Sequence, residues 1–187
     1  MKVLITAGSK HGSTTEIAAT ITSVMSERGM DATFRPPSAF ASIAGYDAVV
    51  IGSAVYAGRW REEVKEFVER HADELQQLDV WLFSSGPLGD PPKPAEDPPD
   101  AAVMLAKTNA HDHRLFTGKL DKRGLSLGER AVVRGVKAPY GDFRDWEAIR
   151  AWATEISDLL VGAISDAEVP AISPVFRLGN PGLAHRD

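Results

Sequence analysis

The chain has 187 residues, a length that suits one α/β domain better than two. Its formal net charge of -5 gives no reason to expect a nucleic-acid partner. It has no cysteine, which excludes disulfides, thiolate metal sites and thiol redox chemistry. Any electron transfer by this chain therefore needs a bound cofactor. The N-terminus has no signal-peptide pattern and no apolar run approaches ~18 residues, so a cytoplasmic location is expected.

Five short apolar runs predict strands, and helical patterns separate most of them. The strands are expected at 2–6, 31–35, 47–52, 80–85 and 113–117. The helices are expected at 13–28, 61–75, 100–109 and 145–161. The runs at 47–52 and 80–85 are almost continuously apolar, as in strands that helices cover on both faces. This alternation predicts an α/β fold within residues 1–163, with a doubly wound parallel sheet and helices on both of its faces.

Three stretches fall outside this alternation. Residues 87–100 are rich in proline and acidic side chains, which predicts a surface loop. Residues 118–140 follow the fifth strand and predict an insertion, made of a loop and a short amphipathic extra helix. Residues 164–187 contain prolines and show little periodicity, so they are expected to form a tail that is disordered or wraps a neighbour.

The turn after the first strand is built from small, hydroxyl and basic residues, Ser9-Lys10-His11-Gly12-Ser13-Thr14. Backbone N–H groups at the start of a helix can point together at an anion, and hydroxyl groups add further donors. The spacing matches neither a Walker A loop nor the G-x-G-x-x-G dinucleotide turn. Two interpretations remain open for this stretch. It holds a phosphate, or Ser13 and Glu16 simply form a capping box that closes the helix.

The turns after the third and fourth strands favour a flat ligand. "GSAVYAGRW", residues 52–60, places small residues beside Tyr56 and Trp60, so the backbone can approach a ring on which an aromatic side chain stacks. "SSGPLG", residues 84–89, is another tight loop of small residues. In an open parallel sheet, ligands bind outside the carboxyl ends of the strands, where these turns meet. A phosphate loop and two ring loops together predict flavin mononucleotide (FMN).

These motifs carry a family resemblance over roughly residues 1–160. "SKHGST" resembles the flavodoxin phosphate loop, with His11 in place of its middle threonine, and "GSAVYAGRW" with "FSSGP" is similar to flavodoxin-domain proteins of the menaquinone-dependent protoporphyrinogen oxidase type. The resemblance implies the strand order 2-1-3-4-5. It also implies that FMN binds where the strand order reverses, as ligands do in doubly wound sheets, flavodoxin among them. By this resemblance the phosphate contacts are Ser9, Lys10, His11, Gly12, Ser13 and Thr14, and the ring contacts are Ser53, Ala54, Val55, Tyr56, Ala57, Gly58, Ser84, Ser85, Gly86, Pro87, Leu88 and Gly89.

This chain departs from the flavodoxin pattern in two places. The first turn begins "TAGSK", and the loop after the fourth strand lacks the aromatic residue that many flavodoxins stack on the ring. Which face of the ring Tyr56 or Trp60 covers is therefore open.

The charges near the ring loop bear on whether the chain is an enzyme or an electron carrier. Arg59 and Arg61, with Trp60 between them, are candidate substrate contacts, because a guanidinium group there would favour an anionic reduced flavin or bind a substrate carboxylate. The alternative is that both arginines are solvated at the start of the 61–75 helix. The favoured function is an FMN-dependent oxidoreductase, possible partners being a quinone, a porphyrinogen or a reductase protein. An electron carrier and a flavin-free module that binds a phosphate ligand are the alternatives, and no catalytic residue is assigned.

Two further features have competing interpretations. The 118–140 segment is basic with interleaved apolar residues. One interpretation is an insertion that builds a substrate pocket or touches a membrane surface. The other is a short helix packed on the sheet with a solvated charged face. His111 and His113 have no third ligand at a diagnostic spacing, which predicts an exposed loop and no metal site.

Overall fold

The computed structural model describes residues 1–39, 41–89, 91–135 and 137–167. Its centre is a parallel sheet in the order β2-β1-β3-β5-β6, to which the short strand β4 adds antiparallel to β3. The strands are β1 (Lys2–Gly8), β2 (Asp31–Arg35), β3 (Ala48–Tyr56), β4 (Arg59–Trp60), β5 (Asp79–Ser85) and β6 (Asp112–Phe116). Counted along the chain without β4, the parallel strands follow the expected order 2-1-3-4-5. The predicted doubly wound fold is confirmed.

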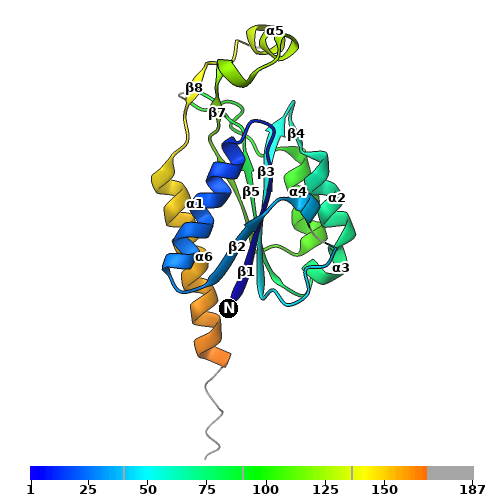
Figure 1. Cartoon of the computed structure of the whole chain (residues 1–187), viewed down its shortest axis with the longest axis vertical. Coiled ribbons are helices and arrows are strands. Elements are labelled where there is room, and N and C mark those ends of the chain that lie inside the picture. The colour runs from blue at the N-terminus through cyan, green and yellow to red at the C-terminus, as the bar shows by residue number, and fades with distance from the viewer. Residues whose placement is uncertain (40, 90, 136, 168–187) are drawn as a thin grey trace, which may run out of the picture.

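Helices cover both faces of the sheet (Figure 1). One face carries α1 (Ser13–Glu27) and α6 (Trp146–Ala167), and the other carries α2 (Glu62–Arg70), α3 (Ala72–Leu75) and α4 (Pro99–Thr108). The helix predicted at 61–75 is divided at His71, whose φ of -112° is not helical. Helix α6 continues through the predicted boundary at residue 163. Of the predicted tail, residues 168–187 lie outside the described part of the chain.

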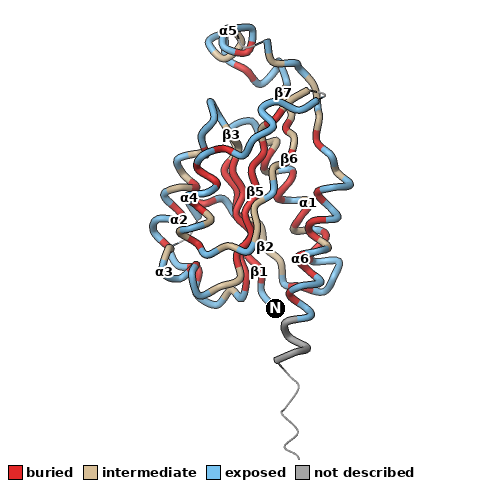
Figure 2. Tube along the Cα trace, turned by 180° about the vertical axis from the view of Figure 1, so that it is seen from behind, coloured by how far each residue is buried: buried red, intermediate tan, exposed pale blue. Residues whose placement is uncertain are grey.

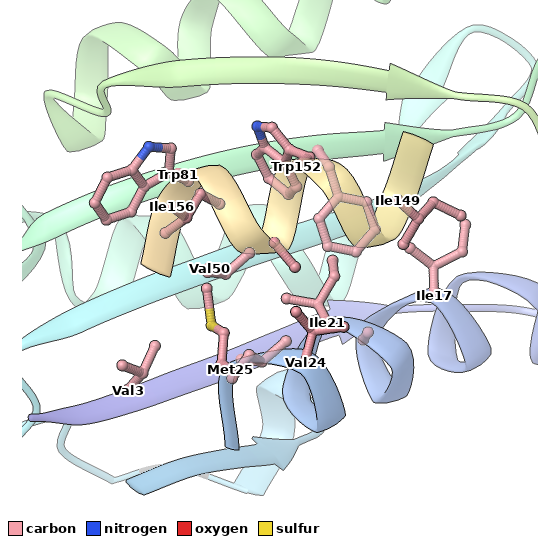
Figure 3. Close-up of a cluster of buried hydrophobic side chains, with 14 of the residues drawn as sticks. Val3, Ile17, Ile21, Val24, Met25, Val50, Trp81, Ile149, Trp152 and Ile156 are labelled. Carbon is pink, nitrogen blue, oxygen red and sulfur yellow. The ribbon is translucent and has the colours of Figure 1, made fainter. Parts of the chain in front are cut away.

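The core forms two layers because the central strands alternate their side chains between the two faces of the sheet. Val3 and Val50 face α1 and α6, where Ile17, Ile21 and Trp152 are also buried (Figure 3). On the opposite face, Leu4, Val49, Ile51 and Leu82 pack with Val64, Phe67 and Val68. Figure 2 shows the same arrangement as a buried band along the middle of the sheet. This packing holds the carboxyl ends of β1, β3 and β5 at one edge.

Strand β3 is longer than predicted and forms an antiparallel hairpin with β4. Residues 53–56, expected in a loop, continue the strand, and the hairpin pairs Val55 with Trp60 and Tyr56 with Arg59. The turn between the two strands is Ala57-Gly58, with φ values of 50° and 78°. A two-residue hairpin turn of this hand needs positive φ at both positions, a conformation that glycine adopts without strain. The hairpin therefore gives the predicted ring loop a defined shape.

The 118–140 segment forms its own small structure beyond the sheet. It contains the short strand β7 (Lys119–Leu120), a 3-10 turn at Lys122–Gly124 and helix α5 (Leu127–Gly135). Strand β7 pairs with β8 (Gly141–Asp142), which follows the segment directly. Figures 1 and 2 show α5 past the edge where the parallel strands end, with mostly exposed residues. The interpretation as a helix packed on the sheet is therefore wrong, because the β7–β8 ribbon carries α5 away from both faces. No described helix is long and apolar enough to cross a membrane.

Candidate functional site

A cavity of about 120 Å³ lies where β1, β3 and β5 end. Three sequence-predicted loops meet there, although they are distant in the chain. The predicted residues that line the cavity are Ser9, Lys10, His11, Ser13, Thr14, Ala54, Val55, Tyr56, Ser85, Gly86 and Leu88. Gly118, Lys119 and Leu120 complete the wall, and the sequence reasoning did not assign them individually. The only sequence signal for them was the insertion in which they lie.

The first turn of α1 leaves a hydroxyl without a partner. Helix α1 begins after Gly12, whose φ is 82°, and no side chain caps it. The Oγ atom of Ser13 is buried and has no hydrogen-bond partner among the described residues. A buried hydroxyl without a partner costs free energy unless a ligand or water satisfies it. The position beside free helix N–H groups fits an anion such as a phosphate.

The capping-box interpretation of this turn is wrong. In a capping box the Glu16 carboxylate would accept from the N-cap N–H. Instead, Glu16 Oε2 accepts a hydrogen bond of 2.7 Å from Nη1 of Arg144. The structure thus removes the competing explanation for the small polar residues of this loop.

Arg144 connects the insertion to the first turn of α1. Its side chain is 2% exposed, and it donates to Asp142 at 2.8 and 2.6 Å and to the Ser13 carbonyl at 3.3 Å. These hydrogen bonds lower the pKa of Asp142 and raise that of Arg144. The guanidinium also lies 4.3 Å from the centre of the Trp146 ring. Arg144 therefore fixes where β8 meets the phosphate loop.

A carboxylate from α5 joins two of the three loops. Glu129 Oε1 lies 2.7 Å from Lys10 Nζ and 3.0 Å from His11 Nε2, and it accepts a hydrogen bond of 2.8 Å from the Tyr56 hydroxyl. The contact with Lys10, more than any other, lowers the pKa of Glu129, so the carboxylate is ionised. The same contact raises the pKa of Lys10, while burial and then Glu129 raise that of Tyr56. Sequence reasoning missed Glu129, because nothing in the sequence around this acidic residue indicates that it contacts the ligand-binding loops.

Some predicted ligand contacts are structural instead. Trp60 is 3% exposed, and its Nε1 donates to Ser84 Oγ at 2.7 Å. Trp60 therefore cannot stack on a ligand, which corrects its assignment as a substrate contact. Ser53 Oγ accepts from the Arg61 N–H at 2.8 Å, so both serines hold the hairpin against the sheet. Tyr56, 38% exposed, is the aromatic residue that remains available.

The two arginines beside the ring loop are both paired. Arg59 Nη1 lies 3.2 Å from the buried carboxylate of Asp100, and Arg61 Nε lies 3.0 Å from Glu63. Each positive charge is thus partly offset by a carboxylate of the chain itself. The expectation that these guanidinium groups act freely on a ligand is not supported by this geometry.

Two larger cavities adjoin the first one. A cavity of about 470 Å³ shares Val55, Gly86 and Leu88 with it and is also lined by Ala57, Gly58 and Pro87 from the predicted ring loops. The other, of about 630 Å³, lies between the proline-rich loop and the end of the insertion, and it includes Leu88, Gly89, Lys93 and Lys137. Leu88 lines all three cavities, which therefore lie next to one another at the edge of the sheet.

The histidines after α4 do not form an exposed loop, and this corrects the sequence interpretation. His113 lies in β6 with 2% of its side chain exposed, and its Nε2 is 2.8 Å from Ser84 Oγ. Burial lowers the pKa of His113, and nearby Asp97 opposes that effect. His111 remains half-exposed beside Asp79. No group of three or more histidine or acidic residues in the described part of the chain could hold a metal ion.

Known proteins share this architecture. The Flavodoxin domain family matches residues 4–146. Protoporphyrinogen IX dehydrogenase (quinone) of Escherichia coli (strain K12) is 30% identical over 176 residues, which cover 85% of this chain and 96% of that protein. A flavodoxin from the domain Archaea superposes with a TM-score of 0.60 at 13% identity, covering 86% of this chain and 99% of that one. Rubredoxin oxygen:oxidoreductase of Desulfovibrio gigas superposes with a TM-score of 0.62 at 15% identity, covering 88% of this chain and 37% of that one. The chain therefore belongs to the flavodoxin-domain family, which supports a flavin as its cofactor.

Proposed function

We propose that this chain is an FMN-dependent oxidoreductase that binds one FMN non-covalently and passes electrons from a reduced organic substrate to a quinone. The observation that carries the proposal is the buried Ser13 Oγ, which has no partner in the part of the chain that the structure describes and lies beside the uncapped start of α1. It supports an anion position at the end of a cavity that the ring loops also line. A phosphate at one end and a flat ring at the other match FMN.

The residues of the site have separable roles in this proposal. The hydroxyl groups of Ser9, Ser13 and Thr14 and the N–H groups at the start of α1 hold the phosphate, and Lys10 adds positive charge. Val55, Tyr56 and Gly86 border the ring. Gly86 has no room for a side chain, because an added Cβ would lie 2.9 Å from the Cβ of Val55. The flavin supplies the redox chemistry when bound, and the protein supplies its position and surroundings.

The walls built by the insertion favour an enzyme over an electron carrier. The 630 Å³ cavity is lined mainly by apolar residues, among them Pro139 and Phe143. Lys93 and Lys137 also line it, and no salt bridge is formed by either lysine within the described residues. An apolar compound with carboxylate groups would complement this lining. The E. coli relative is named for protoporphyrinogen IX and a quinone, and we extend that substrate pair to this chain.

The decisive experiment loads the purified protein with FMN and mixes it, without oxygen, with protoporphyrinogen IX and then with menaquinone. We expect the flavin absorbance to bleach with the first compound and to recover with the second. Parallel samples receive NADH and NADPH, with and without a flavodoxin reductase. Bleaching only through the reductase would instead identify a carrier, and failure to take up FMN would identify a flavin-free module.

We also propose that α5 touches an anionic membrane surface, where a quinone would be found. Segment 118–140 has six basic and two acidic residues in a chain of net charge -5, and Leu127 and Val132 on α5 are 83% and 64% exposed. A basic helix with exposed apolar side chains is typical of binding in a membrane interface. Charge reversal at Lys122, Arg123 and Arg134 should weaken binding to anionic vesicles by roughly 100-fold or more, since each basic residue contributes about 1 kcal/mol.

The matched control reverses three exposed arginines on the body of the protein, Arg35, Arg70 and Arg150, and changes the net charge equally. Sedimentation with vesicles measures binding of both variants. Equal losses in the two variants would show a general charge effect and would contradict contact through α5.

A further inference from the structure

Among the described residues of α5, only Glu129 forms side-chain hydrogen bonds or ion pairs with both ligand-binding loops. One oxygen, Oε1, meets Lys10 and His11 from the turn after β1 and Tyr56 from the end of β3. These partners lie 73 to 119 residues away in the sequence from Glu129. A single carboxylate oxygen thus ties the insertion to the phosphate loop and to the ring loop together.

Little else holds α5 to the body of the protein. Val133 is the one buried side chain of α5, Leu127 and Val132 are mostly exposed, and α5 makes few contacts with the other described helices and strands. The connection to the sheet is the β7–β8 ribbon, in which each strand has two residues. Such sparse burial is typical of segments that open at low free-energy cost.

The cavity beneath α5 is narrow when these contacts are made. Its volume of about 120 Å³ is well below the roughly 300–1,000 Å³ typical of small-molecule sites. Lys10, His11 and Tyr56 belong to its lining, and Glu129 draws all three together. The Glu129 carboxylate is also paired with Lys10, a positively charged residue of the phosphate loop.

We propose that α5 is a lid over the cofactor site and that Glu129 is its latch, so that flavin enters and leaves only when this carboxylate releases Lys10, His11 and Tyr56. The proposal rests on the flavin of the proposed function. It assigns the insertion a role in cofactor exchange that is separate from any contact with substrate or membrane.

The latch can be separated from the local role of Glu129 in its own helix. Its second oxygen, Oε2, accepts from the Ser126 N–H at 2.8 Å, and Ser126 Oγ accepts from the Glu129 N–H at 3.3 Å. This is a capping box at the start of α5, and glutamine serves in a capping box as glutamate does. Glu129→Gln therefore keeps the cap of α5 and removes the charge from the three latch contacts.

The test measures how fast FMN associates with and dissociates from the flavin-free protein, using the change in flavin fluorescence after rapid mixing. An exposed ion pair changes an equilibrium by up to about fivefold, so weakening three contacts should raise the open population by about tenfold. In Glu129→Gln we expect both rate constants to rise by about tenfold, with the Kd changed by less than about threefold. Tyr56→Phe, which removes one contact, should change both rates in the same direction by a smaller factor.

Glu147→Gln is the matched control, since it removes the same charge from an exposed position on α6 and should leave both rates unchanged. Rates for Glu129→Gln within twofold of the unmodified protein would overturn the latch. Faster dissociation with unchanged or slower association would overturn it too, because Glu129 would then be a retaining contact. If the unmodified protein takes up no FMN, the proposed cofactor itself fails, a result distinct from either of these.

Discussion

Ser13→Asp should weaken FMN binding by at least about 100-fold while leaving the fold intact. The Ser13 Oγ, at the first residue of α1, is buried and has no hydrogen-bond partner within residues 1–39, 41–89, 91–135 and 137–167. An aspartate there would place a negative charge where we expect the phosphate. Two like charges about 4 Å apart near a protein surface repel by about 4 kcal/mol, which corresponds to roughly a thousandfold in affinity. An acidic residue in the first turn also stabilises a helix, so the thermal midpoint should not fall.

Fluorescence titration of the flavin-free protein measures this loss, and circular dichroism checks the fold. Ser13→Ala, which removes only one hydrogen bond, should weaken FMN binding by about threefold to tenfold. Riboflavin, which lacks the phosphate, should bind all three proteins equally. Unaltered FMN affinity in Ser13→Asp would show that the phosphate lies elsewhere.

Trp152→Ala should destabilise the protein by about 3–5 kcal/mol, a large part of the ~5–15 kcal/mol typical of a folded domain. Trp152 is 3% exposed in the layer between α6 and the sheet (Figure 3). The centre of its ring lies 5.5 Å from that of Phe116 and 6.1 Å from that of Phe83, and the angles between the ring planes are 71° and 74°. Both are edge-on geometries, which aromatic pairs favour. Truncation removes these contacts and leaves a cavity that the flanking strands cannot fill without moving.

Urea unfolding followed by circular dichroism measures this free energy. Trp152→Phe keeps an aromatic ring and should lose less than half as much stability. Val161→Ala, at a position of the same helix that is 52% exposed, should change stability by less than about 0.5 kcal/mol. A cost below about 1 kcal/mol for Trp152→Ala would contradict the packing of α6 on β5 and β6.

Hydrophobic periodicity was sufficient to predict most of the secondary structure. The runs at 47–52 and 80–85 became the buried centres of β3 and β5, and the helical spacing of Ile17 and Ile21 placed α1 against the sheet. The predicted site loops also converge, because turns that follow parallel strands meet at one edge. These are local patterns, and local patterns are what a sequence displays directly.

Side-chain partners are decided at longer range, and here sequence reasoning failed. Trp60 and Tyr56 are four residues apart and looked equally able to stack on a ring. The return of β4 along β3 buries Trp60 against Ser84 and leaves Tyr56 at the surface. Nothing in the local pattern distinguishes them, since the outcome depends on which face of a hairpin meets the neighbouring strand.

The sequence by itself determined the doubly wound sheet, the order of its helices and strands, and the small polar turn "SKHGST" at the end of the first strand. Only the tertiary structure decided what that turn does. It paired Glu16 with Arg144, it left the Ser13 hydroxyl without a partner among the described residues, and it brought Glu129 into contact with Lys10 and His11. The physical reason is that the path of the insertion, more than 100 residues away along the chain, sets these contacts. The backbone preferences of the residues near the turn therefore cannot predict these contacts.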